Sequence, residues 1–157
     1  MSLILVPTSG PEDWKELLSD PEKHWKKGYS ARSLAYCWEA AKEKTNGFPP
    51  EVAEVFANPV DPLLKDIKPL LVIPEFKVSL PGGKRPSQND IFVLAQSSPG
   101  LVSIMVEGKV DEFFGPTLEE WQCEASEGKK ERLGFLEQKL GLSSVPNGLI
   151  RYQLLHR

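Results

Sequence analysis

The amino-acid sequence predicts an α/β (α+β) fold, with a central mixed sheet of about four strands and an extra N-terminal helical region. Apolar residues recur with a helical period in the first third of the 157-residue chain and alternate with polar residues in the middle third. The helical period returns near the end. A chain of this length is expected to form a single domain, with residues 1–60 mainly helical and residues 61–157 forming a hairpin-bearing core.

Four helices are predicted in the first third of the chain. Ser9-Gly10-Pro11-Glu12 has the spacing of a capping box, and Asp20-Pro21-Glu22 looks like a second helix start. The clearest helix runs from about Ala31 to Lys44 with Ser30 as its cap, because its apolar residues recur at helical spacing. Pro49-Pro50-Glu51 begins a shorter helix.

The middle third predicts three strands joined by turns. We expect them near Leu70–Leu80, Asp90–Gln96 and Leu101–Lys109, where apolar and β-branched residues alternate or run together. Ser97-Ser98-Pro99-Gly100 joins the last two strands into a β-hairpin. Pro81-Gly82-Gly83-Lys84-Arg85 lacks the spacing of a phosphate-binding P-loop and predicts a turn with exposed basic residues.

The last third predicts one helix and a second element that could be either a strand or a helix. Lys129–Leu140 has leucines on one face, and Gly141 stands where a helix-ending glycine belongs. Leu149–Leu155 alternates like a strand, but it could equally begin a helix.

Composition narrows the classes of function. Nineteen basic and 22 acidic residues give a formal charge of −3, so nucleic acid could be bound only through a local patch. Cys37 and Cys123 are far apart and lack CxxC spacing, which argues against a disulfide framework or a zinc site. The longest uncharged stretch, residues 91–106, is interrupted by polar residues, and the N-terminal residues lack a basic leader. We therefore expect a cytoplasmic protein with no membrane contact, and we leave its oligomeric state open.

The predicted hairpin brings charged residues together. A loop centred on Ser98-Pro99 pairs Gln96 with Leu101, and the same register places Asp90 opposite Glu107. Lys109 would project from the same face, two residues farther along the strand. Opposed carboxylates repel each other, so their pairing calls for an explanation.

A divalent cation is one explanation for the paired carboxylates. Mg²⁺ or Mn²⁺ binds one or two carboxylates together with waters, and leaves positions for a phosphate. Lys109 could then orient the attacking water or offset charge that develops on the phosphate. The alternative is a solvated salt-bridge face without a metal.

Asp90 followed by Glu107-Gly108-Lys109 resembles the D…(D/E)xK signature of the PD-(D/E)XK nuclease superfamily. The predicted order of helix, strand, motif-bearing hairpin, helix and final element is similar to the αβββαβ restriction-endonuclease-like core of that superfamily. The resemblance implies a metal-dependent nuclease.

A closer resemblance is to an uncharacterised bacterial family known only as a domain of unknown function, which implies no established activity. Four stretches carry this resemblance. They are Gly28-Tyr29-Ser30-Ala31 with Trp38-Glu39-Ala40-Ala41, Arg85-Pro86-Ser87-Gln88-Asn89-Asp90, Val106-Glu107-Gly108-Lys109-Val110-Asp111, and Arg151-Tyr152-Gln153-Leu154-Leu155-His156-Arg157.

The superfamily resemblance assigns roles to individual residues. Asp90 and Glu107 would be metal ligands assisted by the Gly108 carbonyl, and Lys109 would be the catalytic lysine. Glu39 would be a further metal ligand from the first core helix, and Gln153 a further catalytic residue.

Two residues outside the motif are candidate nucleic-acid contacts. Lys84 and Arg85 lie shortly before Asp90 and could touch the phosphate backbone. A second hypothesis is a non-catalytic interaction or regulatory domain that keeps the fold without turnover, which the acidic charge balance favours.

Overall fold

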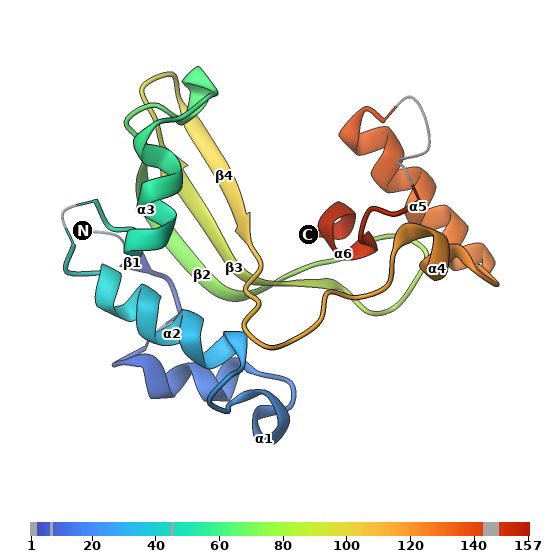
Figure 1. Cartoon of the computed structure of the whole chain (residues 1–157), viewed down its shortest axis with the longest axis horizontal. Coiled ribbons are helices and arrows are strands. Elements are labelled where there is room, and N and C mark those ends of the chain that lie inside the picture. The colour runs from blue at the N-terminus through green and yellow to red at the C-terminus, as the bar shows by residue number, and fades with distance from the viewer. Residues whose placement is uncertain (1–2, 7, 45, 143–147) are drawn as a thin grey trace. The chain divides into compact units, whose positions relative to one another are not determined.

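The computed structural model describes residues 3–6, 8–44, 46–142 and 148–157 (Figure 1). The chain divides into two compact units, each built from two segments. Unit 1 comprises residues 1–76 and 89–112, and unit 2 comprises residues 77–88 and 113–157. The strands are β1 (Leu3–Ile4), β2 (Lys68–Val78), β3 (Ser87–Gln96) and β4 (Leu101–Val106).

The sheet has the strand order β1-β2-β3-β4, and its three longer strands are antiparallel. The short β1 adds a parallel edge through Leu3 opposite Leu71. The hairpin register runs from Gln96 opposite Leu101 to Ile91 opposite Val106, which confirms the predicted register. The last strand ends at Val106, however, so the expected extension to Lys109 is wrong.

In the described residues of unit 1, the helical segments are two 3-10 helices and three α-helices. They are η1 (Pro11–Leu17), α1 (Pro21–His24), α2 (Ser30–Ala41), α3 (Pro50–Ala57) and η2 (Pro62–Leu64). All four helices expected in the first third are present, although the first is a 3-10 helix. The expected end of the third helix at Lys44 is wrong, because α2 ends at Ala41. The first helix, η1, begins after Gly10 without a side-chain cap, so the expected capping box at Ser9 does not form.

The core of unit 1 lies between the sheet and the helices α2 and α3. Alternation along β3 buries Ile91, Val93 and Ala95 on one face, where they pack with Ala35 and Trp38 of α2. The larger of these side chains, such as Ile91 and Val93, each contribute about 1.5–3 kcal/mol when fully buried. Asp90 alternates with these core residues and therefore belongs to the opposite, half-buried face of β3.

Unit 2 contains the helices α4 (Leu118–Gln122), α5 (Glu127–Leu140) and α6 (Tyr152–His156). Its core buries Leu118, Leu133, Leu136 and Tyr152. The helix predicted at Lys129–Leu140 is confirmed as α5, which ends at Gly141 in the left-handed conformation with φ 65°.

The segment near the C-terminus for which the sequence allowed either a strand or a helix forms helix α6. Among the described residues no strand follows β4, and Arg151 contributes only an isolated bridge to Thr117. The fourth strand of the sheet is instead β1. The αβββαβ order expected from the superfamily resemblance is therefore not reproduced in the described part of the chain. None of the helices described there is long and apolar enough to cross a membrane.

Candidate functional site

The end of the hairpin holds Asp90 beside the Glu107-Gly108-Lys109 stretch. Extending the observed register by one position from Ile91 and Val106 brings Asp90 next to Glu107. The Asp90 Oδ2 accepts a hydrogen bond of 2.8 Å from the Gly108 backbone N–H. This carboxylate therefore holds the chain in place where β4 ends.

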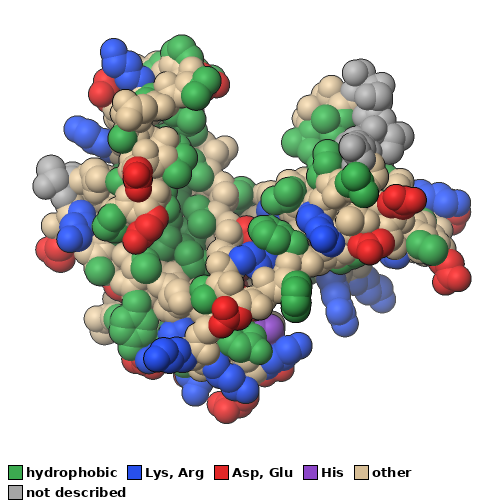
Figure 2. Space-filling view, viewed as in Figure 1, with side chains coloured by type: hydrophobic (Ala, Val, Ile, Leu, Met, Phe, Trp, Pro, Cys, Tyr) green, Lys and Arg blue, Asp and Glu red, His purple; other side chains and the backbone are tan. Residues whose placement is uncertain are grey.

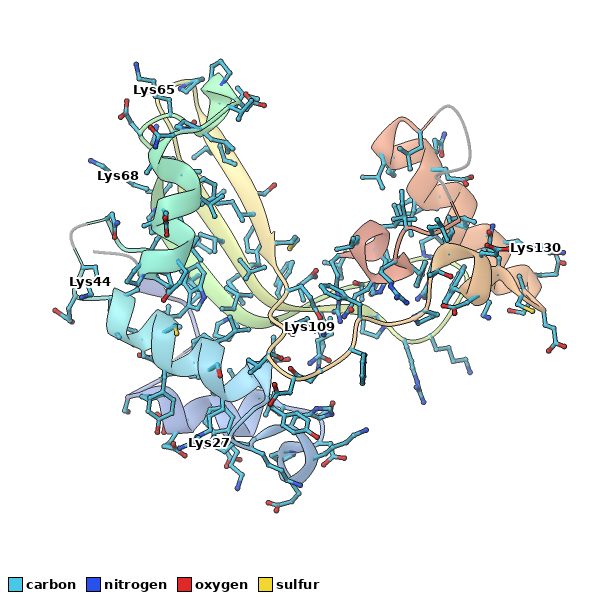
Figure 3. All side chains as sticks on the ribbon, in the orientation of Figure 1. Lys27, Lys44, Lys65, Lys68, Lys109 and Lys130 are labelled. Atoms are coloured by element: carbon cyan, nitrogen blue, oxygen red, sulfur yellow. The ribbon has the colours of Figure 1, made fainter. Side chains whose placement is uncertain are left out.

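Lys109 reaches back to Glu107. Its Nζ lies 2.9 Å from the Glu107 Oε1, and the two side chains are only 20% and 11% exposed. An ion pair shielded to this extent is screened less by water and salt than a surface pair. Lys109 follows the end of β4 (Figure 3) and lies on the same side of the chain as Glu107, two residues before it. The positive charge also offsets the expected repulsion between Asp90 and Glu107.

Gly108 lies directly against helix α2. A Cβ at this position would lie 2.7 Å from the Leu34 Cδ1 and 3.2 Å from the Ser30 Cβ. Contacts this close force the neighbours to shift, so the position between Glu107 and Lys109 favours glycine.

The segment after the motif caps helix α2. Glu112 accepts hydrogen bonds at Oε1 from the backbone N–H of Ser30 at 2.9 Å and from its hydroxyl at 2.8 Å. Its Oε2 accepts from the Val110 N–H at 3.0 Å. The expectation that Ser30 caps this helix is wrong, because Tyr29 is the N-cap residue and its side chain makes no capping hydrogen bond. The Glu112 carboxylate accepts the hydrogen bond from the helix N-terminus instead.

The environment of Glu112 favours its charged form. Burial disfavours ionisation, but the hydrogen bonds from Ser30 and Val110 outweigh it and hold the Glu112 pKa below its ordinary value. Sequence analysis missed this role because 82 residues separate Glu112 from Ser30. The preference of helix N-termini for carboxylates gives no hint of such a distant partner.

Glu39 is engaged by neighbours of its own. Its Oε1 accepts hydrogen bonds of 2.7 Å from the Thr8 hydroxyl and from the Trp14 Nε1, and its Oε2 pairs with Lys42. Burial raises the pKa of this carboxyl, but these partners outweigh it and the pKa is lowered. The contacts tie the N-terminal segment to α2.

The remaining predicted residues belong to unit 2. Gln153 lies on α6, and Lys84 and Arg85 lie in the exposed loop between β2 and β3. The structure therefore brings together Asp90, Glu107 and Lys109 within unit 1, while Gln153, Lys84 and Arg85 form part of the other unit.

The donor set near the hairpin consists of two carboxylates. Within the described residues no group of three or more His, Cys, Asp or Glu side chains could hold a metal ion, so Glu39 does not join Asp90 and Glu107 in such a group. Magnesium needs only one or two protein carboxylates when waters and a phosphate complete its coordination. Asp90 and Glu107 meet that minimum.

The fold and these contacts define a mixed α/β protein with a carboxylate–lysine cluster at the end of a β-hairpin. The family model described as Domain of unknown function (DUF6946) matches residues 7–157, and the chain belongs to this family. The closer of the two resemblances found in the sequence, that to a domain of unknown function, is thereby supported. No curated protein and no solved structure matches the chain.

Proposed function

We propose that this protein hydrolyses phosphodiester bonds in nucleic acid with the help of a divalent metal ion bound at the end of the hairpin. The grouping of Asp90, Glu107 and Lys109 carries the proposal. Two half-buried carboxylates and an ammonium group meet at the end of the hairpin, and the motif follows the D…(D/E)xK order. Carboxylates of this kind can hold a divalent ion, and an ammonium group can stabilise the negative charge that develops on a phosphate.

Asp90 and Glu107 are the side chains that would hold Mg²⁺ or Mn²⁺. The bound ion would polarise the phosphate and lower the pKa of a bound water. The hydrogen bond from the Gly108 N–H fixes the orientation of the Asp90 carboxylate, which keeps this ligand in place before substrate arrives.

Lys109 would act on the substrate phosphate. Its Nζ carries three protons, of which one is donated to the Glu107 Oε1. The other two donors would orient the attacking water and meet the charge on the phosphate oxygens. The membership of the PD-(D/E)XK superfamily is part of this proposal.

The test is a calorimetric titration with Mn²⁺ followed by cleavage assays on DNA and RNA. Saturable binding is expected in the wild-type protein and should be lost in Glu107→Gln. Glu54→Gln serves as the matched control, because Glu54 is an exposed carboxylate on α3. Lys109→Met should keep Mn²⁺ binding but abolish cleavage. Absence of Mn²⁺ binding by the wild-type protein, with and without an oligonucleotide, would contradict the proposal.

A non-catalytic interaction domain is the second candidate. The observation in its favour is that Asp90 and Glu107 are already bound within the protein, to Gly108 and Lys109. In this case the cluster only stabilises the hairpin. Glu107→Gln would then lower the free energy of unfolding by about 1 kcal/mol, while the wild-type protein would neither bind Mn²⁺ nor cleave nucleic acid.

A further inference from the structure

Unit 2 contains a small pocket surrounded by basic side chains. Its volume is about 240 Å³, and it is lined by Lys84, Arg85, Lys129 and Arg132, together with Trp121 and three glycines. Four of the lining residues are basic and none is acidic. In Figure 2, Lys and Arg side chains project from the lower edge of this unit.

The loop that carries Lys84 and Arg85 is held firmly on helix α5. Gly82 has a positive φ of 77°, and a Cβ there would collide with the carbonyl oxygen of Gly128 in the first turn of α5. Arg132 binds the same loop from the next turn. Its Nε donates to the Pro81 carbonyl at 2.9 Å, and its Nη2 donates to the Arg85 carbonyl at 3.1 Å. The backbone of the loop is therefore fixed.

The four basic side chains of the pocket differ in the hydrogen bonds that they already make. Lys129 donates to the Trp121 carbonyl at 2.7 Å, and Arg132 is used by the loop. Lys84 and Arg85 are exposed, and their side chains make no hydrogen bond or ion pair with other residues in the described ranges. These two side chains can therefore turn toward a ligand, while the other two add positive charge from fixed positions.

Four cations around one small pocket repel one another, and an anion would relieve that repulsion. A volume of about 240 Å³ lies below the usual range of roughly 300–1,000 Å³ for pockets that take drug-sized molecules. The space suits a small anion. Guanidinium and ammonium groups together are the usual partners of phosphate oxygens.

The Trp121 ring is not open for stacking a base. Its ring lies 3.8 Å from that of Tyr152 at an angle of 12°, and the Lys129 Nζ lies 5.2 Å from its centroid. Since both contacts occupy the ring, recognition in this pocket would depend on charge rather than on the base.

We propose that the pocket formed by Lys84, Arg85, Lys129 and Arg132 binds a phosphate group. The ligand is a phosphate carried either by a nucleic-acid strand or by a small molecule, including inorganic phosphate. The pocket belongs to unit 2 and stands independently of the proposed metal site in unit 1.

The test compares phosphate binding by two charge-matched double variants in calorimetry, in a buffer free of phosphate and sulfate. Lys84→Gln/Arg85→Gln removes the two side chains available to a ligand. Lys130→Gln/Lys139→Gln removes the same charge from exposed positions of α5 outside the pocket. We expect saturable binding by the wild-type protein, at least about tenfold weaker binding by the first variant, and little change in the second. Circular dichroism verifies that both variants fold.

Three ligands separate the sources of the phosphate: inorganic phosphate, an oligonucleotide with a 5′-phosphate, and the same oligonucleotide without it. Binding of all three indicates a site for backbone and free phosphates, and binding of only the first two indicates a site for a terminal or free phosphate. Absence of binding by every ligand would overturn the proposal. Equal losses in the two double variants would also overturn it, because they would show a general effect of charge. Neither outcome depends on Mn²⁺ binding or cleavage in unit 1.

Discussion

Gly108 lies so close to Leu34 that a side chain at position 108 would require Leu34 to shift. The Cβ of an alanine there would lie 2.7 Å from the Leu34 Cδ1 and 3.0 Å from the Leu34 Cγ. The contact joins the carboxylate–lysine cluster to helix α2. The same helix is capped by Glu112, four residues farther along the chain, so α2 and the segment after β4 support each other.

Gly108→Ala should lower the free energy of unfolding by about 1–3 kcal/mol, because the added methyl group forces Leu34 and Ser30 to shift. Gly100→Ala is the control in the same unit, since a Cβ at Gly100 meets nothing within 4 Å. The control should change stability by less than about 1 kcal/mol. Urea denaturation of both variants measures the difference, and equal effects would show that the contact with Leu34 is not tight.

Glu112→Gln should destabilise the protein by about 1–2 kcal/mol at pH 7, because the neutral amide accepts fewer and weaker hydrogen bonds from Ser30 and Val110. The pKa of the folded state lies below the ordinary value of 4.5. The contribution of the ionised carboxylate is therefore complete above pH 4.5 and is lost as the pH falls through the lower folded-state value.

The measurement is urea denaturation of the wild-type protein and Glu112→Gln at several pH values from 7 to 3. The difference between them should shrink below pH 4.5. Glu54→Gln provides an exposed glutamate on α3 for comparison. A difference that stayed constant down to pH 3 would mean that the charge on Glu112 contributes nothing to the cap.

The hairpin and most helices could be predicted because their signals are local. The residues between Gln96 and Leu101 determine the turn, and the turn determines the whole register. Gly141 ends α5 in the left-handed conformation that glycine adopts readily. One local signal was overlooked: Thr117 and Glu120 form a complete capping box at the start of α4.

Other features depend on contacts between distant residues and could not be predicted from a local pattern. The element at Leu149–Leu155 alternates like a strand, but Tyr152 stacks on Trp121 and the segment becomes helix α6. The candidate site shows the same limit. The hairpin register predicts that Asp90 lies opposite Glu107, whereas Lys109 lies beyond Val106, the last paired residue of β4, and is held by its contact with Glu107.

Glu39→Ala should lower the free energy of unfolding by about 1–3 kcal/mol, because Trp14 is only 3% exposed and its Nε1 would lose its hydrogen-bond acceptor. Lys42→Met removes only the ion pair with Glu39 and should cost less. Guanidinium denaturation followed by tryptophan fluorescence compares the two. A Glu39→Gln variant that folds should bind Mn²⁺ as the wild-type protein does, and a clear loss of affinity would instead make Glu39 a metal ligand.

His156 should make unit 2 less stable in mild acid. Ser87 donates its hydroxyl proton to the His156 carbonyl at 2.7 Å, so the Nδ1–H of the imidazole is the donor in the 2.9 Å contact with the same hydroxyl. Burial, together with the positive charges of Arg157 and Arg132, lowers the pKa of His156 from 6.5 to about 4. The imidazole is thus held neutral in the folded protein.

The sign of the pH effect follows from that lowered pKa. Between pH 6.5 and about 4 the unfolded chain binds a proton that the folded ring does not, so stability is complete above pH 6.5 and declines as the pH falls toward 4. We expect a loss of about 1–2 kcal/mol, allowing for the partial exposure of the ring. Thermal melting between pH 7 and pH 4 should show a shallower decline for His156→Gln than for the wild-type protein. A slope for His156→Gln equal to that of the wild-type protein would show that His156 does not titrate on unfolding.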